Sequence, residues 1–292
     1  MQFAGSYVAL LTPFRQGAVD ERAFQDFVAW QIAEGTDGLV PCGTTGESPT
    51  LSHDEHKRVI ELTLEVAKGK AMVMAGAGSN STAEAIDLTR HAQEAGADAV
   101  LSVCPYYNRP TQEGLFRHYQ AIHDGSDIPI FIYNIPGRSG VEMSIDTMKR
   151  LAELPRIVGV KDATADLARP LRTKLAIGAD FVQFSGEDIT IVPFLAQGGQ
   201  GCISVTANVA PRLCAELHRA WKAGNFAAVA ELNERLAPLS DAMFVESSPA
   251  PVKFAASLLG NCQIEIRLPL APASAMARER VTAALRQTGL VN

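Results

Sequence analysis

Lys161 stands at the end of a short apolar run and is the residue that the sequence places best for covalent chemistry. The run Ile157–Val160 is typical of a buried strand, so the amine that follows it is expected among hydrophobic walls, where burial disfavours its charged form. A neutral amine attacks a carbonyl carbon and forms an imine. A strand-terminal lysine more often points to solvent, so the chemical interpretation depends on the motifs that accompany it.

Three further motifs carry groups that such chemistry would use. The glycine-flanked turn Gly43–Gly46 holds two threonines whose hydroxyls and amides suit a carboxylate, and no lysine follows it as a Walker loop requires. Tyr133 ends another apolar run, where a phenol can exchange a proton with a carbinolamine oxygen. Arg138 follows a glycine on a predicted loop, and its guanidinium suits a substrate carboxylate. Each also has a plainer explanation: a capped loop, a buried phenol bonded to a carbonyl, a surface charge.

The elements that must position these groups alternate regularly. Eight short runs rich in Val, Ile, Leu and Phe recur, and a stretch with helical spacing follows each, such as 20–34 and 53–67. The runs are residues 7–11, 38–41, 72–75, 99–103, 130–133, 157–161, 181–185 and 201–205. Eight βα units fit a closed (β/α)₈ barrel of the α/β class better than an open doubly wound sheet. No G-x-G-x-x-G motif opens a helix after the first strand.

A helical segment follows the eighth βα unit. Apolar helical patterns cover residues 226–244, 251–259 and 273–287, and no low-complexity linker precedes them. We therefore expect residues 1–224 to form the catalytic barrel and residues 225–292 to form a helical extension packed on it. In a barrel of this kind the reactive side chains lie at the carboxyl ends of the strands, which is where Lys161, Tyr133 and the threonine turn fall.

The composition argues against several classes of function. With 292 residues and 47% hydrophobic content, the chain can bury a large core. A net charge of -6 disfavours nucleic acid as a partner, because a nucleic-acid surface needs clustered Lys and Arg. Residues 1–11 do not read as a secretory leader and no apolar run has membrane-spanning length, so we expect a cytoplasmic protein. The five cysteines are widely spaced, which disfavours disulfides and zinc.

Taken together, the motifs resemble the dihydrodipicolinate synthase family of pyruvate-dependent class I lyases. The resemblance covers essentially the whole chain and rests on five segments: Gly43–Glu47, Pro105–Asn108, Tyr133–Arg138, Gly159–Lys161 and Gly201–Val205. It implies a barrel with a three-helix tail, assembled as a homotetramer that is a dimer of dimers. It also implies condensation of pyruvate with L-aspartate 4-semialdehyde to 4-hydroxy-tetrahydrodipicolinate, in the diaminopimelate route to lysine, without a metal or organic cofactor.

The resemblance also implies a role for each site residue. Lys161 is similar to the lysine that binds pyruvate as a Schiff base, and Tyr133 to the phenol that moves protons at the bound substrate. Thr44 and Tyr107 would join Tyr133 in a hydroxyl relay, with Tyr107 reaching into the neighbouring subunit, so that dimerisation would be needed for catalysis. The implied substrate-binding residues are Thr45 for the pyruvate carboxylate, Gly186 and Ile203 for backbone contacts, and Arg138 for the aldehyde's carboxylate.

A second, allosteric site is implied by the same resemblance. Six residues match the family's feedback site for L-lysine: Ser48, His53, His56, Asn80, Glu84 and Tyr106. From the residues alone, His53 and His56 lie one helical turn apart, and Asn80 and Glu84 share a face if a helix begins near Asn80. A solvated helix face is the plainer explanation of the histidine pair. Pro49, Ser139 and Pro41–Cys42 depart from the residues that are common in the family.

Two alternative functions stay open. Another lyase of the superfamily, cleaving N-acetylneuraminate or a 2-keto-3-deoxy sugar acid, would keep Lys161, Tyr133 and the threonine turn. Arg138 and Tyr107 favour the aspartate-semialdehyde enzyme, because a sugar acid needs groups that bind hydroxyls. A catalytically silent paralogue that only binds a keto acid or lysine is the alternative from a different class.

Overall fold

The structure is a computed structural model that describes residues 3–292. In these residues, eight strands close into a barrel in the order β1-β10-β9-β8-β7-β6-β5-β4. The strands are β1 (Gly5–Ala9), β4 (Gly38–Val40), β5 (Met72–Gly76), β6 (Ala99–Val103), β7 (Ile130–Asn134), β8 (Ile157–Asp162), β9 (Val182–Ser185) and β10 (Gly201–Ser204). The predicted barrel is therefore confirmed. A short antiparallel pair, β2 (Phe14–Arg15) and β3 (Ala18–Val19), was not predicted.

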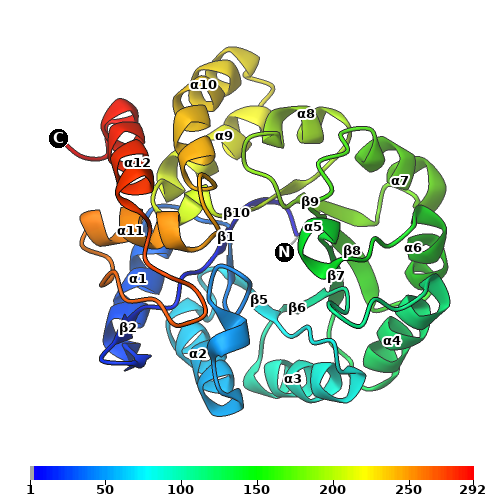
Figure 1. Ribbon diagram of the computed structural model, residues 1–292. Coiled ribbons are helices and arrows are strands. Elements are labelled where there is room, and N and C mark those ends of the chain that lie inside the picture. The colour runs from blue at the N-terminus through cyan, green and yellow to red at the C-terminus, as the bar shows by residue number, and fades with distance from the viewer. Residues whose placement is uncertain (1–2) are drawn as a thin grey trace. The chain divides into compact units, whose positions relative to one another are not determined.

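The chain divides into two compact units, and the described residues of the first are Val73–Ile203 together with Phe3 and Ala4. Its helices are α3 (Thr82–Ala95), α4 (Gln112–Asp124), α5 (Pro136–Ser139), α6 (Ile145–Ala152), α7 (Arg169–Ile177) and α8 (Ile191–Ala196). Helices α3, α4, α6 and α7 pack in sequence order along the outer side of its strands (Figure 1). Phe131 of β7 lies edge-on to Phe184 of β9, with ring centroids 5.8 Å apart.

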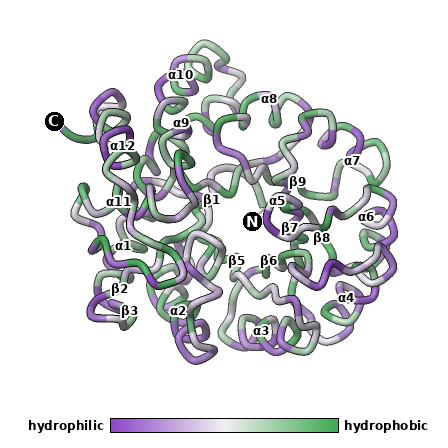
Figure 2. Tube along the Cα trace, in the orientation of Figure 1, coloured by the Kyte–Doolittle hydropathy of each residue, from purple (hydrophilic) through white to green (hydrophobic). Residues whose placement is uncertain are grey.

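Hydropathy in the first unit follows the expected division between strands and helices. Strand β7 is buried along its whole length, as is all of β8 except Val158. Hydrophilic residues gather on the outer turns of α3, α4 and α6 (Figure 2). The strands are thus apolar runs buried on both faces, which is typical of a parallel sheet covered by helices.

The second unit comprises Gly5–Met72 and Ser204–Asn292. Its helices are α1 (Glu21–Ala33), η1 (Ser48–Thr50), α2 (His53–Ala67), η2 (Thr206–Asn208), α9 (Pro211–Lys222), α10 (Phe226–Ala242), α11 (Ala250–Leu258) and α12 (Ala275–Thr288). The three helices expected after residue 224 are present. The domain boundary at that residue stays a prediction, and it falls between the end of α9 and the start of α10.

Local sequence explains where several elements begin and end. Helix α2 begins after a capping box in which Ser52 and Glu55 satisfy each other's backbone amides. Strand β1 ends at Ala9, two residues before the predicted end, because the amide of Leu11 donates to Oδ1 of Asn208 (3.0 Å) and not to a neighbouring strand. Among the described residues, no helix has both the length and the apolar character needed to cross a bilayer.

Candidate functional site

Lys161 and Tyr133 lie side by side on neighbouring strands. The parallel register of β7 and β8 pairs Tyr133 directly with Lys161. The lysine is 5% exposed and the tyrosine 7% exposed. The amine Nζ lies 4.4 Å from the centroid of the tyrosine ring. The structure thus brings together the predicted imine-forming amine and the predicted proton-transfer phenol at the carboxyl ends of two adjacent strands.

Gly186 follows β9 and packs against the stem of Lys161. A Cβ atom added at Gly186 would lie 2.7 Å from the Cβ of Ala163, closer than real Cβ atoms approach, and 3.1 Å from the Cε of Lys161, a tight contact. The amide of Gly186 also donates to the carbonyl of Asp162 (2.7 Å). A glycine therefore fits here, because a side chain would collide with Ala163 and press on the stem of Lys161. Ile203, also predicted to contact substrate through its backbone, is fully buried in β10.

An acidic side chain beside this lysine was not singled out from the sequence. Burial raises the pKa of the Glu187 carboxyl, the nearby Asp188 raises it further, and the positive charge of Lys161 lowers it. The backbone of Glu187 is fixed by Ser185, whose hydroxyl accepts from its amide (3.0 Å). The sequence signal that could have indicated Glu187 is its place directly after Gly186, at the carboxyl end of β9.

Arg138 lies in a short helix and not in the loop that the sequence predicted. Helix α5 begins with Pro136, whose fixed φ suits a first helical turn, and ends at Gly140, which has a left-handed φ of 71°. Ser139 stabilises this turn, because its single hydroxyl proton can be donated to the carbonyl of either Ile135 (2.9 Å) or Val141 (2.8 Å). The side chain of Arg138 itself is exposed.

The threonine turn follows β4 in the second unit. The amides of Gly46 and Glu47 donate to the carbonyls of Gly43 and Thr44 (both 3.1 Å), so these two amides close the turn. Thr45 is buried and Thr44 is partly exposed. The hydroxyl of Thr12, just beyond β1, donates to the carbonyl of Gly46 (2.7 Å) and holds the turn from the side.

A buried ion pair at the end of this turn was not predicted from the sequence. Glu47 and Lys253 of α11 are each 1% exposed, and the lysine amine donates to the glutamate carboxylate. The amide of Arg267 donates to the other oxygen of Glu47 (3.0 Å), and Nζ of Lys253 lies 4.1 Å from the centroid of the Phe14 ring. Burial lowers the pKa of Lys253, and the charge of Glu47 opposes that shift.

Tyr107 projects from the loop after β6. Its side chain is 91% exposed and its backbone is left-handed, with a φ of 69°. Such a conformation is costly for a bulky residue. The loop is fixed at Asn108, whose amide donates to the carbonyl of Tyr106 (2.8 Å) and whose side chain donates to the carbonyl of Asn80 (2.9 Å).

The six residues predicted to bind lysine fall into two groups. In the first unit, the side-chain amide of Asn80 donates to the carbonyl of Tyr106 (3.3 Å), and Glu84 accepts from the hydroxyl of Ser79. Helix α3 begins at Thr82 after the N-cap Ser81, so the expectation that Asn80 shares a helix face with Glu84 is wrong. The alternative backbone path arises because the amide of Ser81 bonds to the hydroxyl of Ser79 (3.0 Å) and turns the chain before the helix.

The second group lies in the second unit. Ser48 begins the turn η1, which also contains the exposed Pro49. His53 and His56 lie one turn apart on α2 as predicted, the first exposed and the second buried. The hydrogen bond from Sγ of Cys42 to the carbonyl of His56 (3.4 Å) joins this helix to the residue before the threonine turn. Burial raises the pKa of the Cys42 thiol, which makes this cysteine a packing residue and not a nucleophile.

Comparison with known proteins agrees with this geometry. A family model described as the dihydrodipicolinate synthetase family matches residues 2–288. A 4-hydroxy-tetrahydrodipicolinate synthase of Rhodospirillum centenum is 66% identical over 289 residues, covering 99% of each chain. The structure is similar to a chloride-inhibited dihydrodipicolinate synthase of Acinetobacter baumannii complexed with pyruvate, with a TM-score of 0.97, 44% identity and coverage of 99% of this chain and 100% of that one.

A further solved structure, dihydrodipicolinate synthase of Cyanidioschyzon merolae with lysine bound, has a TM-score of 0.96 and 36% identity and covers 100% of both chains. Relatives of this identity and coverage share both fold and enzyme class, and the enzyme class is lyase. Three observations therefore indicate the same family: the closed barrel, the lysine at a strand end beside a tyrosine, and the family match over nearly the whole chain. The chain belongs to the dihydrodipicolinate synthetase family.

Proposed function

We propose that this protein condenses pyruvate with L-aspartate 4-semialdehyde to form 4-hydroxy-tetrahydrodipicolinate through a Schiff base on Lys161. The observation that carries the proposal is the buried amine of Lys161, held 4.4 Å from the Tyr133 ring centroid and packed against Gly186. The side chain of Lys161 is buried away from solvent, and the phenol of the neighbouring Tyr133 can donate or accept a proton. The named relatives support the same reaction.

The steps of the reaction follow from imine chemistry. The amine of Lys161 attacks the ketone carbon of pyruvate, and Tyr133 supplies the proton with which the carbinolamine oxygen leaves as water. The iminium then makes the methyl group acidic, and loss of one of its protons gives an enamine. The enamine carbon attacks the aldehyde carbon of the second substrate and forms the new C–C bond. Finally the amino group of that substrate attacks the imine carbon, closes the ring and releases Lys161.

Substrate contacts are assigned to the remaining predicted residues. We assign Thr45 to the carboxylate of pyruvate, and the exposed guanidinium of Arg138 to the carboxylate of the aldehyde substrate. We assign Thr44 and Tyr107 to the proton relay with Tyr133. The exposed, left-handed Tyr107 supports the further proposal that it inserts into a second subunit, within a homotetramer built as a dimer of dimers.

Borohydride trapping tests the central step. Reduction in the presence of pyruvate should add one reduced pyruvate unit to the protein, and peptide mass spectrometry should place it on Lys161. The variant Lys161→Arg, with a similar length and charge but no nucleophilic amine, should stay unlabelled. Labelling of that variant, or an unlabelled wild-type protein, would overturn the Schiff-base mechanism.

The second substrate is tested separately. A coupled assay should detect product from pyruvate and L-aspartate 4-semialdehyde, while the same protein should not cleave N-acetylneuraminate. The variant Arg138→Lys keeps the charge but loses the planar fork, so it should raise the KM for the aldehyde more than that for pyruvate. Turnover of N-acetylneuraminate alone would reassign the substrate and leave the imine chemistry intact.

We also propose that L-lysine inhibits the enzyme through the residues Ser48, His53, His56, Asn80, Glu84 and Tyr106. The proximity of Asn80 to Tyr106 and the carboxylate of Glu84 support this, because a lysine ammonium needs an acidic partner. The relative crystallised with lysine supports it as well. Titrating activity with L-lysine should show inhibition that Glu84→Gln weakens, and full activity at millimolar lysine would contradict the proposal.

A further inference from the structure

A polar network lies directly behind the strand ends that carry Tyr133 and Lys161. Asn134 follows Tyr133 at the end of β7, Asp162 follows Lys161 at the end of β8, and the register pairs these residues as well. Successive side chains of a strand point to opposite faces, so Asn134 and Asp162 point away from the face that carries the amine and the phenol. The side-chain amide of Asn134 donates to Oδ2 of Asp162 (3.4 Å), and both residues are buried.

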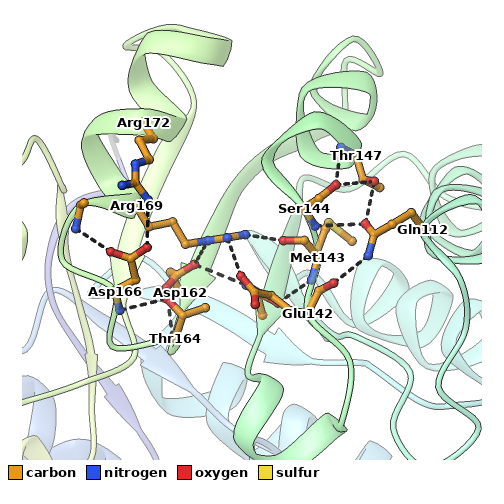
Figure 3. Close-up of polar contacts among 12 residues, drawn as sticks. Gln112, Glu142, Met143, Ser144, Thr147, Asp162, Thr164, Asp166, Arg169 and Arg172 are labelled. Atoms are coloured by element: carbon orange, nitrogen blue, oxygen red, sulfur yellow. Dashed lines mark hydrogen bonds and ion pairs between the residues drawn. The ribbon is translucent and has the colours of Figure 1, made fainter.

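Arg169, the first residue of α7, is the centre of this network (Figure 3). Its Nε donates to Oδ2 of Asp162 (2.8 Å), its Nη1 donates to Oε1 of Glu142 (2.7 Å), and its Nη2 donates to the carbonyl of Met143. The other oxygen of Asp162 accepts from the amide (3.1 Å) and the hydroxyl (2.6 Å) of Thr164. The arginine side chain is 7% exposed, and its buried positive charge is stabilised by two carboxylates and one backbone carbonyl.

The far side of the network is the segment that follows Arg138. Met143 lies five residues after Arg138, and its amide donates to Oδ1 of Asn134 (3.0 Å). One guanidinium therefore ties the carboxyl end of β8, the strand that bears Lys161, to the segment that leads out of α5. Because Lys has a single nitrogen in place of the planar fork, it cannot hold Asp162, Glu142 and the Met143 carbonyl together.

We propose that Arg169 is a positioning residue that sets the Schiff-base lysine and the carboxylate-binding Arg138 at their working separation. The proposal rests on the proposed function, since it assumes that both groups contact substrate in one reaction. Arg169 touches no reacting atom in this mechanism. Its effect comes through Asp162, which fixes the end of β8, and through Glu142 and Met143, which fix the segment after α5. Displacement of a substrate-binding group by about 1 Å can cost about a hundredfold in rate.

Two variants separate the two arms of the network. Arg169→Lys should slow pyruvate imine formation, raise the KM for the aldehyde and lower kcat/KM by about tenfold or more. Glu142→Gln removes only the charge on the loop side, where the side chain is 53% exposed, so the protein should stay folded. It should raise the KM for the aldehyde about threefold or more, while the rate of borohydride-trapped pyruvate labelling stays unchanged. This split between the two substrates is the readout that a merely structural role would not give.

Arg172→Gln is the matched control. Arg172 lies on the same helix and pairs with Asp166 at 3.3 Å, but its side chain is 65% exposed. The control should match wild type in every rate. If Arg169→Lys and Glu142→Gln behave like Arg172→Gln while the wild type forms the pyruvate imine, the positioning role is wrong and the proposed function stands. If the wild type forms no imine, both proposals fail together.

Discussion

The buried pair of Glu47 and Lys253 gives the sharpest stability prediction. Both side chains are essentially inaccessible to solvent, and burial lowers the pKa of the lysine while the glutamate opposes that shift. Replacing Lys253 by Met keeps most of the side-chain volume but leaves the carboxylate of Glu47 without its cation. Removal of one partner of a buried pair costs about 3–5 kcal/mol. We expect Lys253→Met to lower the free energy of unfolding by that amount.

Urea unfolding measures this loss, and one fixed protein concentration is used because the apparent stability of any protein that assembles depends on its concentration. The double variant Glu47→Gln/Lys253→Met removes both charges and should recover part of the loss. The control is Arg212→Met, which breaks an exposed pair with Glu34 and should cost at most about 1 kcal/mol. If Lys253→Met were no more destabilising than Arg212→Met, the reasoning from burial would be refuted.

Three further predictions concern other parts of the molecule. Gly186→Ala should reduce pyruvate labelling by borohydride without unfolding the protein, because its Cβ would lie 2.7 Å from the Cβ of Ala163 and 3.1 Å from the Cε of Lys161 and would shift the lysine stem; unchanged labelling would contradict this. Burial lowers the pKa of His118 to about 4, so its proton is taken up by the unfolded chain first, and stability should fall as the pH drops from about 6.5 to 4. His118→Gln should flatten that slope, which is at most about 1.4 kcal/mol per pH unit for one proton, as pH-dependent urea unfolding would show. The hydrogen bond from Arg267 lowers the pKa of Glu55 to about 2, so its stabilisation is present above about pH 4.5 and lost as the pH falls toward 2; Glu55→Gln should remove that acid-dependent part of the thermal stability.

The barrel and the adjacency of Tyr133 and Lys161 could be predicted from the sequence because both depend on local patterns. Each apolar run of five or so residues followed by a helical stretch is a complete βα unit, and consecutive units of this kind lie next to each other. Tyr133 and Lys161 end consecutive runs, so their adjacency follows from the order of the chain. Gly186 was assigned a backbone contact with substrate from family resemblance, and that assignment stays a prediction; its packing against the lysine stem was not predicted.

The features that were missed depend on partners far away in the chain. Leu10 and Leu11 are as apolar as the strand before them, and only Asn208, 197 positions from Leu11, takes the Leu11 amide out of the sheet. Lys253 reads as an ordinary helix charge, because nothing near it in the sequence reveals that Glu47 will be buried beside it. Arg169 likewise opens a helix, a place where a charged residue is usually solvated.

The tie between Glu47 and Lys253 also bears on how the enzyme is made. The two residues are 206 positions apart, so a ribosome that adds about 5–20 residues per second needs about 10–40 s to go from the first to the second. Throughout that time the threonine turn exists without its cationic partner. A chain truncated before α11 would lack Lys253, so its buried Glu47 carboxylate would stay without a cation.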